Sequence, residues 1–377
     1  MGFSFKSIPV IDGHIHFGHV DRIDALLQIM KTVPMAKINL ASVPVPGTIN
    51  QNPALIAFKD RYPATTYLSG ALDYSQVAAE DWSTVDPAAM SENLGRQIET
   101  LKASGFDGLK LLESKPTYRK WIPFPLDAPH YEGMWAALES LAMPVLWHVA
   151  DPEEFWNDDL APSFAKEQGW LYGDGTFTTK EALYQEVENV LTRHPQLKVI
   201  FAHFYFLSAD LELAGRFFDA HPNVCFDLTP GSEMISNFTR NFAAARDFFI
   251  RYQDRFVYGT DIMSAGLASA QGTAHALGKA WLVRMYLESA GVFKPQEAMA
   301  DWLAPDLEGF RGFALPRDVL EKIYHANFER LYGATPAVLN LDRASEVLRR
   351  MAAVRGAAGV DGDGTNLARQ MEQMLLG

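Results

Sequence analysis

Short apolar segments alternate with helix-like segments along most of this 377-residue chain, and this alternation restricts the fold more than any other feature. Most of the apolar segments are nearly continuous, as expected of parallel strands that are covered on both faces. The predicted strands are residues 8–16, 36–43, 65–72, 106–112, 143–149, 197–203, 223–228 and 255–261. The predicted helices are residues 21–33, 53–62, 87–104, 130–142, 179–194, 209–221, 238–253 and 273–290. Eight strands and eight helices in alternation predict an α/β fold, a (β/α)₈ or TIM barrel, because a doubly wound sheet usually stops at five or six strands.

Two parts of the chain depart from this repeat. Residues 151–177 are long, polar and aromatic and follow the fifth predicted strand, so they are interpreted either as a lid over a barrel site or as a surface insertion. Residues 291–315 are expected to be rich in loops, and 316–333 to form a terminal helix. We therefore predict a barrel domain over residues 1–335 and a helical C-terminal extension over 336–377 that packs on the barrel or on a partner subunit.

Composition narrows the class of function. The net charge of −13 disfavours a nucleic acid or an anionic membrane as partner. The single cysteine, Cys225, excludes an intramolecular disulfide and a multi-cysteine zinc cluster, so any metal must use His, Asp or Glu. The first residues lack the pattern of a secretory signal, and no run of about 20 apolar residues is present. These features indicate a soluble cytoplasmic protein.

Polar residues gather at the carboxyl ends of the predicted strands. His14 and His16 end the first strand, His148 the fifth, His203 the sixth and Asp261 the eighth. Side chains two residues apart on a strand point to the same face, so His14 and His16 are expected to lie side by side. The carboxyl ends of barrel strands carry the reactive groups of barrel enzymes. Imidazole and carboxylate groups collected there suit Zn²⁺ or a similar divalent ion.

These residues, together with Lys110 and the segment around residues 320–333, resemble the amidohydrolase superfamily. The narrower resemblance is to the branch that contains aminocarboxymuconate-semialdehyde decarboxylase and related aromatic-acid decarboxylases and hydrolases. The resemblance spans roughly residues 8–333 and implies one divalent metal ion, zinc or alternatively manganese. The implied metal ligands are His14, His16, His148 and Asp261, and the implied catalytic groups for proton transfer are His203 and Asp261.

Other residues are candidates with competing interpretations. Lys110 is either a carbamylated metal bridge, as in binuclear members of the superfamily, a group that binds a substrate anion, or a structural lysine. Asp227 either fixes the tautomer of a histidine or caps a loop. Arg119 either binds a substrate carboxylate or belongs to a solvated basic turn. Trp156 and Tyr205 belong to a set of aromatic residues that either line a substrate pocket or fill the core.

The leading functional hypothesis is a metal-dependent hydrolase that acts on a carbonyl, ester, lactone or amide of a small, ring-bearing molecule. The alternative is a non-oxidative decarboxylase of an aromatic or muconate-like acid, and a third hypothesis is a catalytically silent barrel that binds a ligand. The expected partner is a small-molecule substrate, and the resemblance together with the C-terminal helices favours a homodimer. Fold and ligand set do not choose between these reactions, because both are shared across many chemistries.

Overall fold

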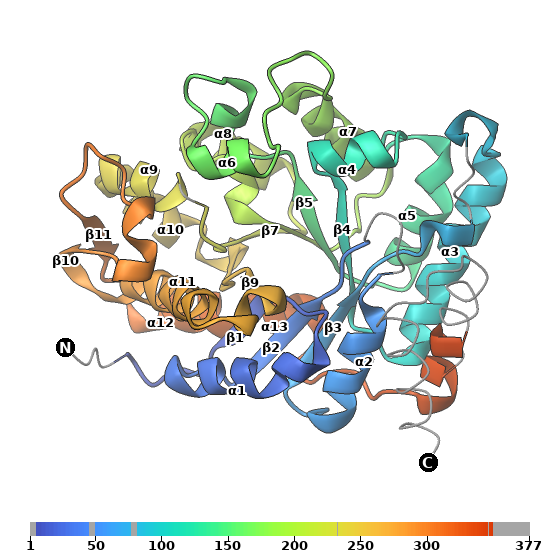
Figure 1. Cartoon of the computed structure of the whole chain (residues 1–377), viewed down its shortest axis with the longest axis horizontal. Coiled ribbons are helices and arrows are strands. Elements are labelled where there is room, and N and C mark those ends of the chain that lie inside the picture. Colours follow the sequence, from blue (N-terminus) through green and yellow to red (C-terminus); the bar gives the residue numbers. More distant parts are fainter. Residues whose placement is uncertain (1–4, 45–49, 77–80, 232, 346, 350–377) are drawn as a thin grey trace. The chain divides into compact units, whose positions relative to one another are not determined.

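The computed structural model describes residues 5–44, 50–76, 81–231, 233–345 and 347–349 (Figure 1). The chain divides into two compact units. The first unit comprises residues 1–40, 64–66 and 199–335. The second comprises residues 41–63, 67–198 and 336–377. Within the described residues, no helix is both long and apolar enough to cross a membrane.

Parallel strands form the centre of the first unit. β6 (Val199–Phe201), β7 (Val224–Asp227) and β8 (Phe256–Val257) pair in that order, and β1 (Ile11–His16) pairs with β9 (Ile262–Met263). β2 (Lys37–Ala41) begins in this unit. Nearly every residue of these strands is buried, as the apolar sequence runs predict.

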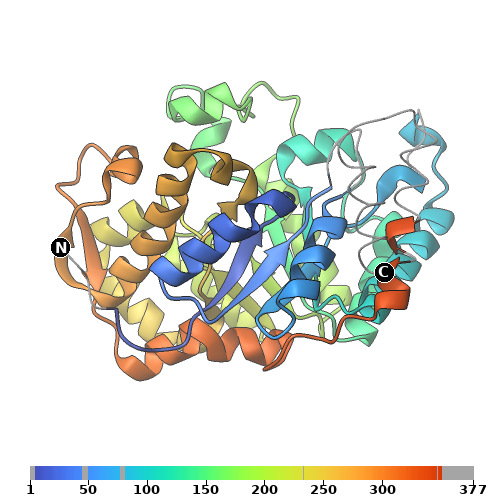
Figure 2. The same cartoon turned by 60° about the horizontal axis from the view of Figure 1, so that its bottom comes forward.

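Helices cover the strands of the first unit. They are α1 (Ile23–Thr32), α8 (Leu211–Ala220), α9 (Met234–Arg240), α10 (Phe242–Arg251), α11 (Ala270–Glu288), α12 (Arg317–Glu321) and α13 (Asn327–Tyr332). Helix α1 packs beside α11 (Figure 2). Ser269 begins α11 by accepting a hydrogen bond from the backbone N–H of Gly272, which satisfies one of the unpaired donors of the first turn.

The second unit repeats the strand and helix alternation. β3 (Thr66–Gly70), β4 (Gly108–Ser114) and β5 (Val145–Val149) form parallel pairs in that order. Its helices are α2 (Asn52–Arg61), α3 (Pro87–Ser104), α4 (Pro116–Trp121), α5 (Glu132–Ser140), α6 (Ser163–Glu167) and α7 (Lys180–Arg193). Helices α3 and α5 pack closely because Gly133 lacks a side chain: a Cβ there would lie 2.3 Å from the Ser91 carbonyl oxygen.

The α/β (β/α)₈ fold class predicted from the sequence is confirmed by this order of elements and by the parallel pairing within each unit. All eight predicted strands occur, and Thr179, the first residue of the helix predicted over 179–194, caps α7. The predicted helix 238–253 is instead two helices, because Asn241 leaves the helical conformation between α9 and α10. Asparagine is a weak helix former, since its side chain competes for backbone hydrogen bonds.

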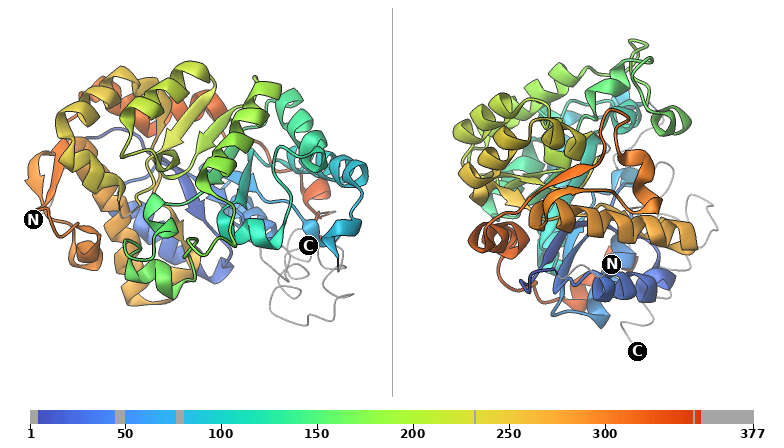
Figure 3. Two further views of the ribbon diagram at one scale, coloured as in Figure 1. Left: turned by 90° about the horizontal axis from the view of Figure 1, so that it is seen from above. Right: turned by 90° about the vertical axis from the view of Figure 1, so that its left-hand side faces the viewer.

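The loop-rich region predicted over residues 291–315 contains an antiparallel hairpin. β10 (Ala290–Phe293) pairs with β11 (Phe310–Phe313), and the hairpin packs against α9 and α11 (Figure 3). The terminal helix predicted over 316–333 contains a π-helical stretch, Lys322–Ala326, between α12 and α13. Of the predicted C-terminal extension, residues 341–345 are helical, and residue 346 and residues 350–377 lie outside the described residues. The domain boundary at residue 335 stays a prediction.

Candidate metal centre

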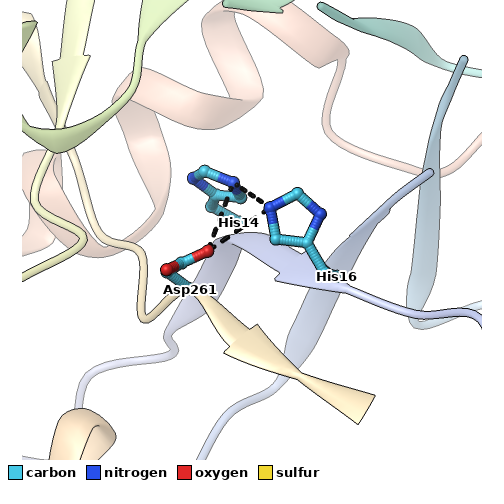
Figure 4. Close-up of side chains that lie close together, drawn as sticks. All are labelled: His14, His16 and Asp261. Carbon is cyan, nitrogen blue, oxygen red and sulfur yellow. Dashed lines mark hydrogen bonds and ion pairs between the residues drawn. The ribbon is translucent and has the colours of Figure 1, made fainter. Parts of the chain in front are cut away.

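Strand β1 places two imidazoles side by side. Ile15 is fully buried on the opposite face of the strand, and His14 and His16 point the same way. Their Nε2 atoms lie 3.1 Å apart, and the ring centroids are separated by 4.9 Å (Figure 4). The predicted alternation of side chains along this strand is therefore confirmed.

Asp261 brings a carboxylate to the same point. It directly precedes β9, and its backbone N–H donates to the His14 carbonyl oxygen at 2.9 Å. Its Oδ1 lies 3.3 Å from His16 Nε2 and 3.8 Å from His14 Nε2 (Figure 4). Asp261 holds a left-handed backbone conformation with φ of 54°, which is uncommon for residues other than glycine and asparagine.

The three groups suit a divalent metal ion. One ligand atom from each of His14, His16 and Asp261 lies within 4.8 Å of the others. Nitrogen and oxygen ligands bind zinc at about 2.0–2.2 Å, so two ligands of one ion lie roughly 3–3.5 Å apart. The separations between His14 and His16 and between His16 and Asp261 match this spacing, and a small movement of Asp261 would bring the third into the same range.

Asp227 contacts the other ring nitrogen of His14, Nδ1. Its Oδ2 lies 2.8 Å from His14 Nδ1, and both side chains are fully buried. A histidine that donates its Nδ1–H to a carboxylate presents the unprotonated Nε2 as a ligand, with raised basicity. Strand β7, which ends at Asp227, supplies this contact, and Asp227 Oδ1 also accepts a hydrogen bond from the Thr229 backbone N–H at 3.1 Å. The role of Asp227 in fixing the tautomer of His14 stays a prediction. Here the name His14 cluster denotes His14, His16, Asp227 and Asp261.

His203 lies beside this cluster on a strained turn. Its ring centroid is 5.7 Å from that of His14, and its backbone N–H donates to Asp227 Oδ1 at 2.7 Å. Residues 203–206 all have positive φ values, between 50° and 57°. Consecutive left-handed residues without glycine are energetically costly, so the surrounding contacts must hold this turn in place. The predicted role of His203 in proton transfer stays a prediction.

Two charged residues of the site were not anticipated from the sequence. Lys279 on α11 donates to the Asp261 main-chain oxygen at 2.9 Å and to Asp261 Oδ2 at 3.2 Å. Burial alone would raise the pKa of Asp261, but the Lys279 ammonium, the hydrogen bond from His16 and the neighbouring imidazoles hold it well below its usual value. Lys279 carries no sequence signal, because it lies 18 residues after Asp261 inside an ordinary helical pattern.

Asp12 is the second of these residues. It accepts hydrogen bonds from the backbone N–H groups of His14 and Thr260 and from the Thr260 hydroxyl. It is fully buried, and the loss of hydration raises its pKa to about 7 despite these hydrogen bonds. Asp12 thereby joins the end of β1 to the segment that precedes β9.

Asp261 also lies in the wall of a cavity of about 790 Å³ within the first unit. The cavity runs along α11, where Lys279 and, one turn earlier, His275 face it. Gln271, Glu297 and Asp301 add further polar groups. This volume lies in the usual range of small-molecule sites. His275 had no distinguishing signal in the sequence, since it lies within a helix and away from every strand end.

A second polar cluster lies in the second unit. His148 on β5 directs Nε2 toward the Ala150 carbonyl oxygen at 2.9 Å and toward Asp151 Oδ1 at 3.3 Å. Asp151 also accepts hydrogen bonds from Lys115 and, at 2.6 Å, from the Tyr172 hydroxyl. We call His148, Asp151, Lys115 and Tyr172 the Asp151 cluster. The assignment of His148 as a metal ligand stays a prediction.

Burial dominates the pKa of His148, lowering it to about 4, so the imidazole is neutral near pH 7. Asp151 shows the opposite balance. Its burial would raise the pKa, but Lys115 and the hydrogen bond from His148 hold it far below its usual value. The Asp151 cluster therefore carries an ionised carboxylate and an ammonium that neutralise each other.

The predicted substrate-binding residues lie in different surroundings. Lys110 is fully buried on β4, and Trp156 packs on Tyr172 in a small aromatic core formed within residues 151–177. Arg119 is buried and paired with Glu186, so the alternative of a solvated basic turn is wrong for Arg119, whereas the neighbouring Lys120 is exposed. Tyr205 packs its ring against Phe201, Phe217 and Phe226. Substrate contact by these four residues stays a prediction.

Comparison with known proteins agrees with this reading of the fold. A structure from Staphylococcus aureus, provisionally assigned as an amidohydrolase, has 15% identity and a TM-score of 0.50, covering 86% of this chain and 100% of that one. A 2,6-dihydroxybenzoate decarboxylase from Rhizobium has 14% identity and a TM-score of 0.50, with 86% and 98% coverage. No curated protein shows significant sequence similarity. Residues 11–334 match the sequence profile of the amidohydrolases. The resemblance found in the sequence is thus confirmed, and the chain belongs to the amidohydrolase family.

Proposed function

We propose that this protein is a metal-dependent hydrolase that acts on a carbonyl, ester, lactone or amide of a small molecule. The observation that carries the proposal is the convergence of His14, His16 and Asp261 at one point, with Asp261 in the wall of a cavity large enough for such a substrate. A divalent ion, zinc or manganese, would polarise the substrate carbonyl and lower the pKa of water. His14, His16 and Asp261 would hold it, with His148 as the further predicted ligand.

The residues around this point support hydrolysis in particular. The Asp261 carboxylate lies beside the two imidazoles, where it can exchange a proton with a water molecule held at this point. Asp227 keeps His14 in a single tautomer. It also accepts a hydrogen bond from the backbone N–H of His203, which keeps the His203 imidazole close to that of His14. His203 would then receive or return a proton as the leaving group departs. Asp261 and His203 are the two groups assigned to proton transfer.

The second candidate is a non-oxidative decarboxylase. It is favoured by the likeness to solved structures of 2,6-dihydroxybenzoate decarboxylase, one of them with 2,6-dihydroxybenzoate bound and a TM-score of 0.50 at 15% identity. A decarboxylase must deliver a proton to carbon, which requires an acid that is protonated at working pH. Loss of a carboxylate as CO₂ also requires a cation that binds it, and Lys279 is instead paired with Asp261, so hydrolysis is the leading proposal.

One assay separates the two reactions. Chelator-treated protein is incubated with a panel of aryl esters, lactones and hydroxybenzoates before and after addition of Zn²⁺ or Mn²⁺. The hydrolase proposal predicts release of acid that requires the added metal and disappears in the variant His14→Ala. Release of CO₂ from a hydroxybenzoate without net acid formation would assign the decarboxylase instead. Turnover that is unaffected by chelation would contradict both.

A further inference from the structure

Lys279 divides the two oxygens of the Asp261 carboxylate between different partners. Asp261 Oδ1 faces the imidazoles of His14 and His16, whereas Oδ2 accepts a hydrogen bond from Lys279 Nζ. A second bond from Nζ to the Asp261 main-chain oxygen fixes the ammonium at the base of the same residue. Lys279 is 8% exposed and lies on the long helix α11, so its position is set by packing rather than by a mobile surface chain.

This arrangement is unfavourable for cation binding taken alone. An ammonium that touches a metal-ligating carboxylate repels the ion, and such repulsion is significant over a few ångströms in a partly buried site. A chain that only had to bind a metal tightly would gain affinity by placing a neutral group there. The position of Lys279 is therefore better explained by control of how Asp261 binds than by the strength of binding.

Carboxylates bind divalent ions through one oxygen or through both. We propose that Lys279 restricts Asp261 to binding the metal through Oδ1 alone. The inference rests on the proposed metal-dependent function. It makes Lys279 a positioning residue that acts through Asp261. While Lys279 holds Oδ2, that oxygen would not compete with water or substrate for the ion.

The variant Lys279→Met tests this inference because it removes the ammonium while retaining a long apolar side chain. The probe is Co²⁺, titrated into chelator-treated full-length protein and followed by its visible absorption. We expect Lys279→Met to bind Co²⁺ about tenfold more tightly, because the repulsive charge is gone and Asp261 can bind through both oxygens. Its absorption should weaken, as it does when the coordination number of Co²⁺ rises. Turnover should fall at least tenfold in kcat with KM changed much less.

Three further variants make the result decisive. Lys279→Arg retains a cationic donor and is expected to keep wild-type Co²⁺ affinity and absorption. Lys279→Gln is neutral and polar, and it should reproduce the tighter binding if Lys279→Met does not fold. Lys31→Met makes the same change at an exposed lysine in the last turn of α1 and should alter nothing.

The outcomes distinguish this inference from the function on which it rests. Co²⁺ binding that becomes weaker or stays equal in both Lys279→Met and Lys279→Gln would overturn the role of Lys279. Loss of a lysine that only holds Asp261 in place would give one of these two results. Failure of the wild-type protein to bind Co²⁺ would overturn the proposed metal-dependent function, and this inference with it. Tighter binding with lower kcat in the neutral variants supports both.

Discussion

The His14 cluster and the Asp151 cluster both lie at carboxyl ends of strands, yet their buried charged groups have different partners. In the Asp151 cluster, the carboxylate accepts from Lys115, Tyr172 and His148, so acid and base neutralise each other within the cluster. In the His14 cluster, two imidazole nitrogens and one carboxylate oxygen converge on a single point, and Lys279 bonds to the other carboxylate oxygen.

This difference shows that a polar residue at a strand end can belong either to a structural network or to a metal site, and that the partners of its side chain distinguish the two. Buried polar groups whose donors and acceptors pair with one another contribute to a fixed local structure. Nitrogen and oxygen atoms that converge on one point form a ligand set whose close approach is most favourable when a cation is bound. The first pattern is typical of structural networks and the second of metal sites.

The largest effect is expected from removal of a ligand in the His14 cluster. His14→Ala should lower kcat/KM at least about a thousandfold, because loss of the metal removes several kcal/mol of transition-state stabilisation. His325→Ala in the same unit removes an imidazole that pairs with Glu329 on the following turn, and it should retain normal turnover. Comparable rates in His14→Ala and wild type would show that the convergence has no catalytic meaning.

Removal of the cation from the Asp151 cluster should reduce stability. Lys115→Met leaves a buried carboxylate without its ammonium, and breaking a buried pair in this way costs about 3–5 kcal/mol. The measurement is the free energy of unfolding by urea, with Lys166→Met, at an exposed position of α6, as the control. A decrease in the free energy of unfolding below about 1 kcal/mol would mean that the pairing of Lys115 with Asp151 does not stabilise the fold.

The pH dependence of stability should distinguish Asp12 from acids that have a cationic partner. The folded protein holds a proton on Asp12 up to about pH 7, whereas the unfolded chain loses it near pH 3.8. The unfolded state therefore binds fewer protons between these values, and stability falls as pH rises through this window, by up to about 4 kcal/mol. Unfolding of chelator-treated protein at pH 4.5 and pH 7.5 measures the fall, which Asp12→Asn should abolish and Asp21→Asn should leave in place. An equal fall in Asp12→Asn would assign the effect to other groups.

A smaller effect is expected when the orientation of His14 is loosened. Asp227→Asn keeps the size of the side chain but no longer favours the tautomer in which Nδ1 of His14 donates. Loss of such an outer partner typically lowers metal affinity 10–100-fold. Competition with a chromogenic chelator measures the affinity, and an unchanged dissociation constant would show that Asp227 has only a structural role.

The smallest effect is expected in the cavity wall. His275→Ala should raise KM severalfold with little change in kcat, because His275 faces the cavity but lies one helical turn from Lys279. Steady-state kinetics with whichever substrate the assay identifies separates the two constants. A fall in kcat with KM unchanged would indicate that His275 takes part in the chemical step.

The alternation of apolar runs was sufficient to predict all eight strands and the fold class, because buried parallel strands leave a strong local pattern. The pairing of His14 with His16, and the support from Asp227, also followed from local rules: alternation along a strand and the position of polar residues at strand ends. These features depend only on short segments and on the general architecture.

Contacts between residues far apart in the sequence could not be predicted from these local rules. Lys279 meets Asp261 only because α11 packs beside the segment that precedes β9, and nothing in its own neighbourhood marks it. In the sequence pattern Asp12 is only one residue of a mostly apolar strand, but its side chain joins β1 to Thr260, 248 residues later. Likewise, Arg119 pairs with a residue 67 positions away, which its local sequence does not reveal.

Metal binding by the purified chain tests the central claim most directly. Calorimetric titration of chelator-treated protein with Zn²⁺ or Mn²⁺ should give about one ion per wild-type chain, unchanged binding in His325→Ala, and no measurable binding in His16→Ala. Full stoichiometric binding by His16→Ala, or none by the wild-type chain, would contradict the account.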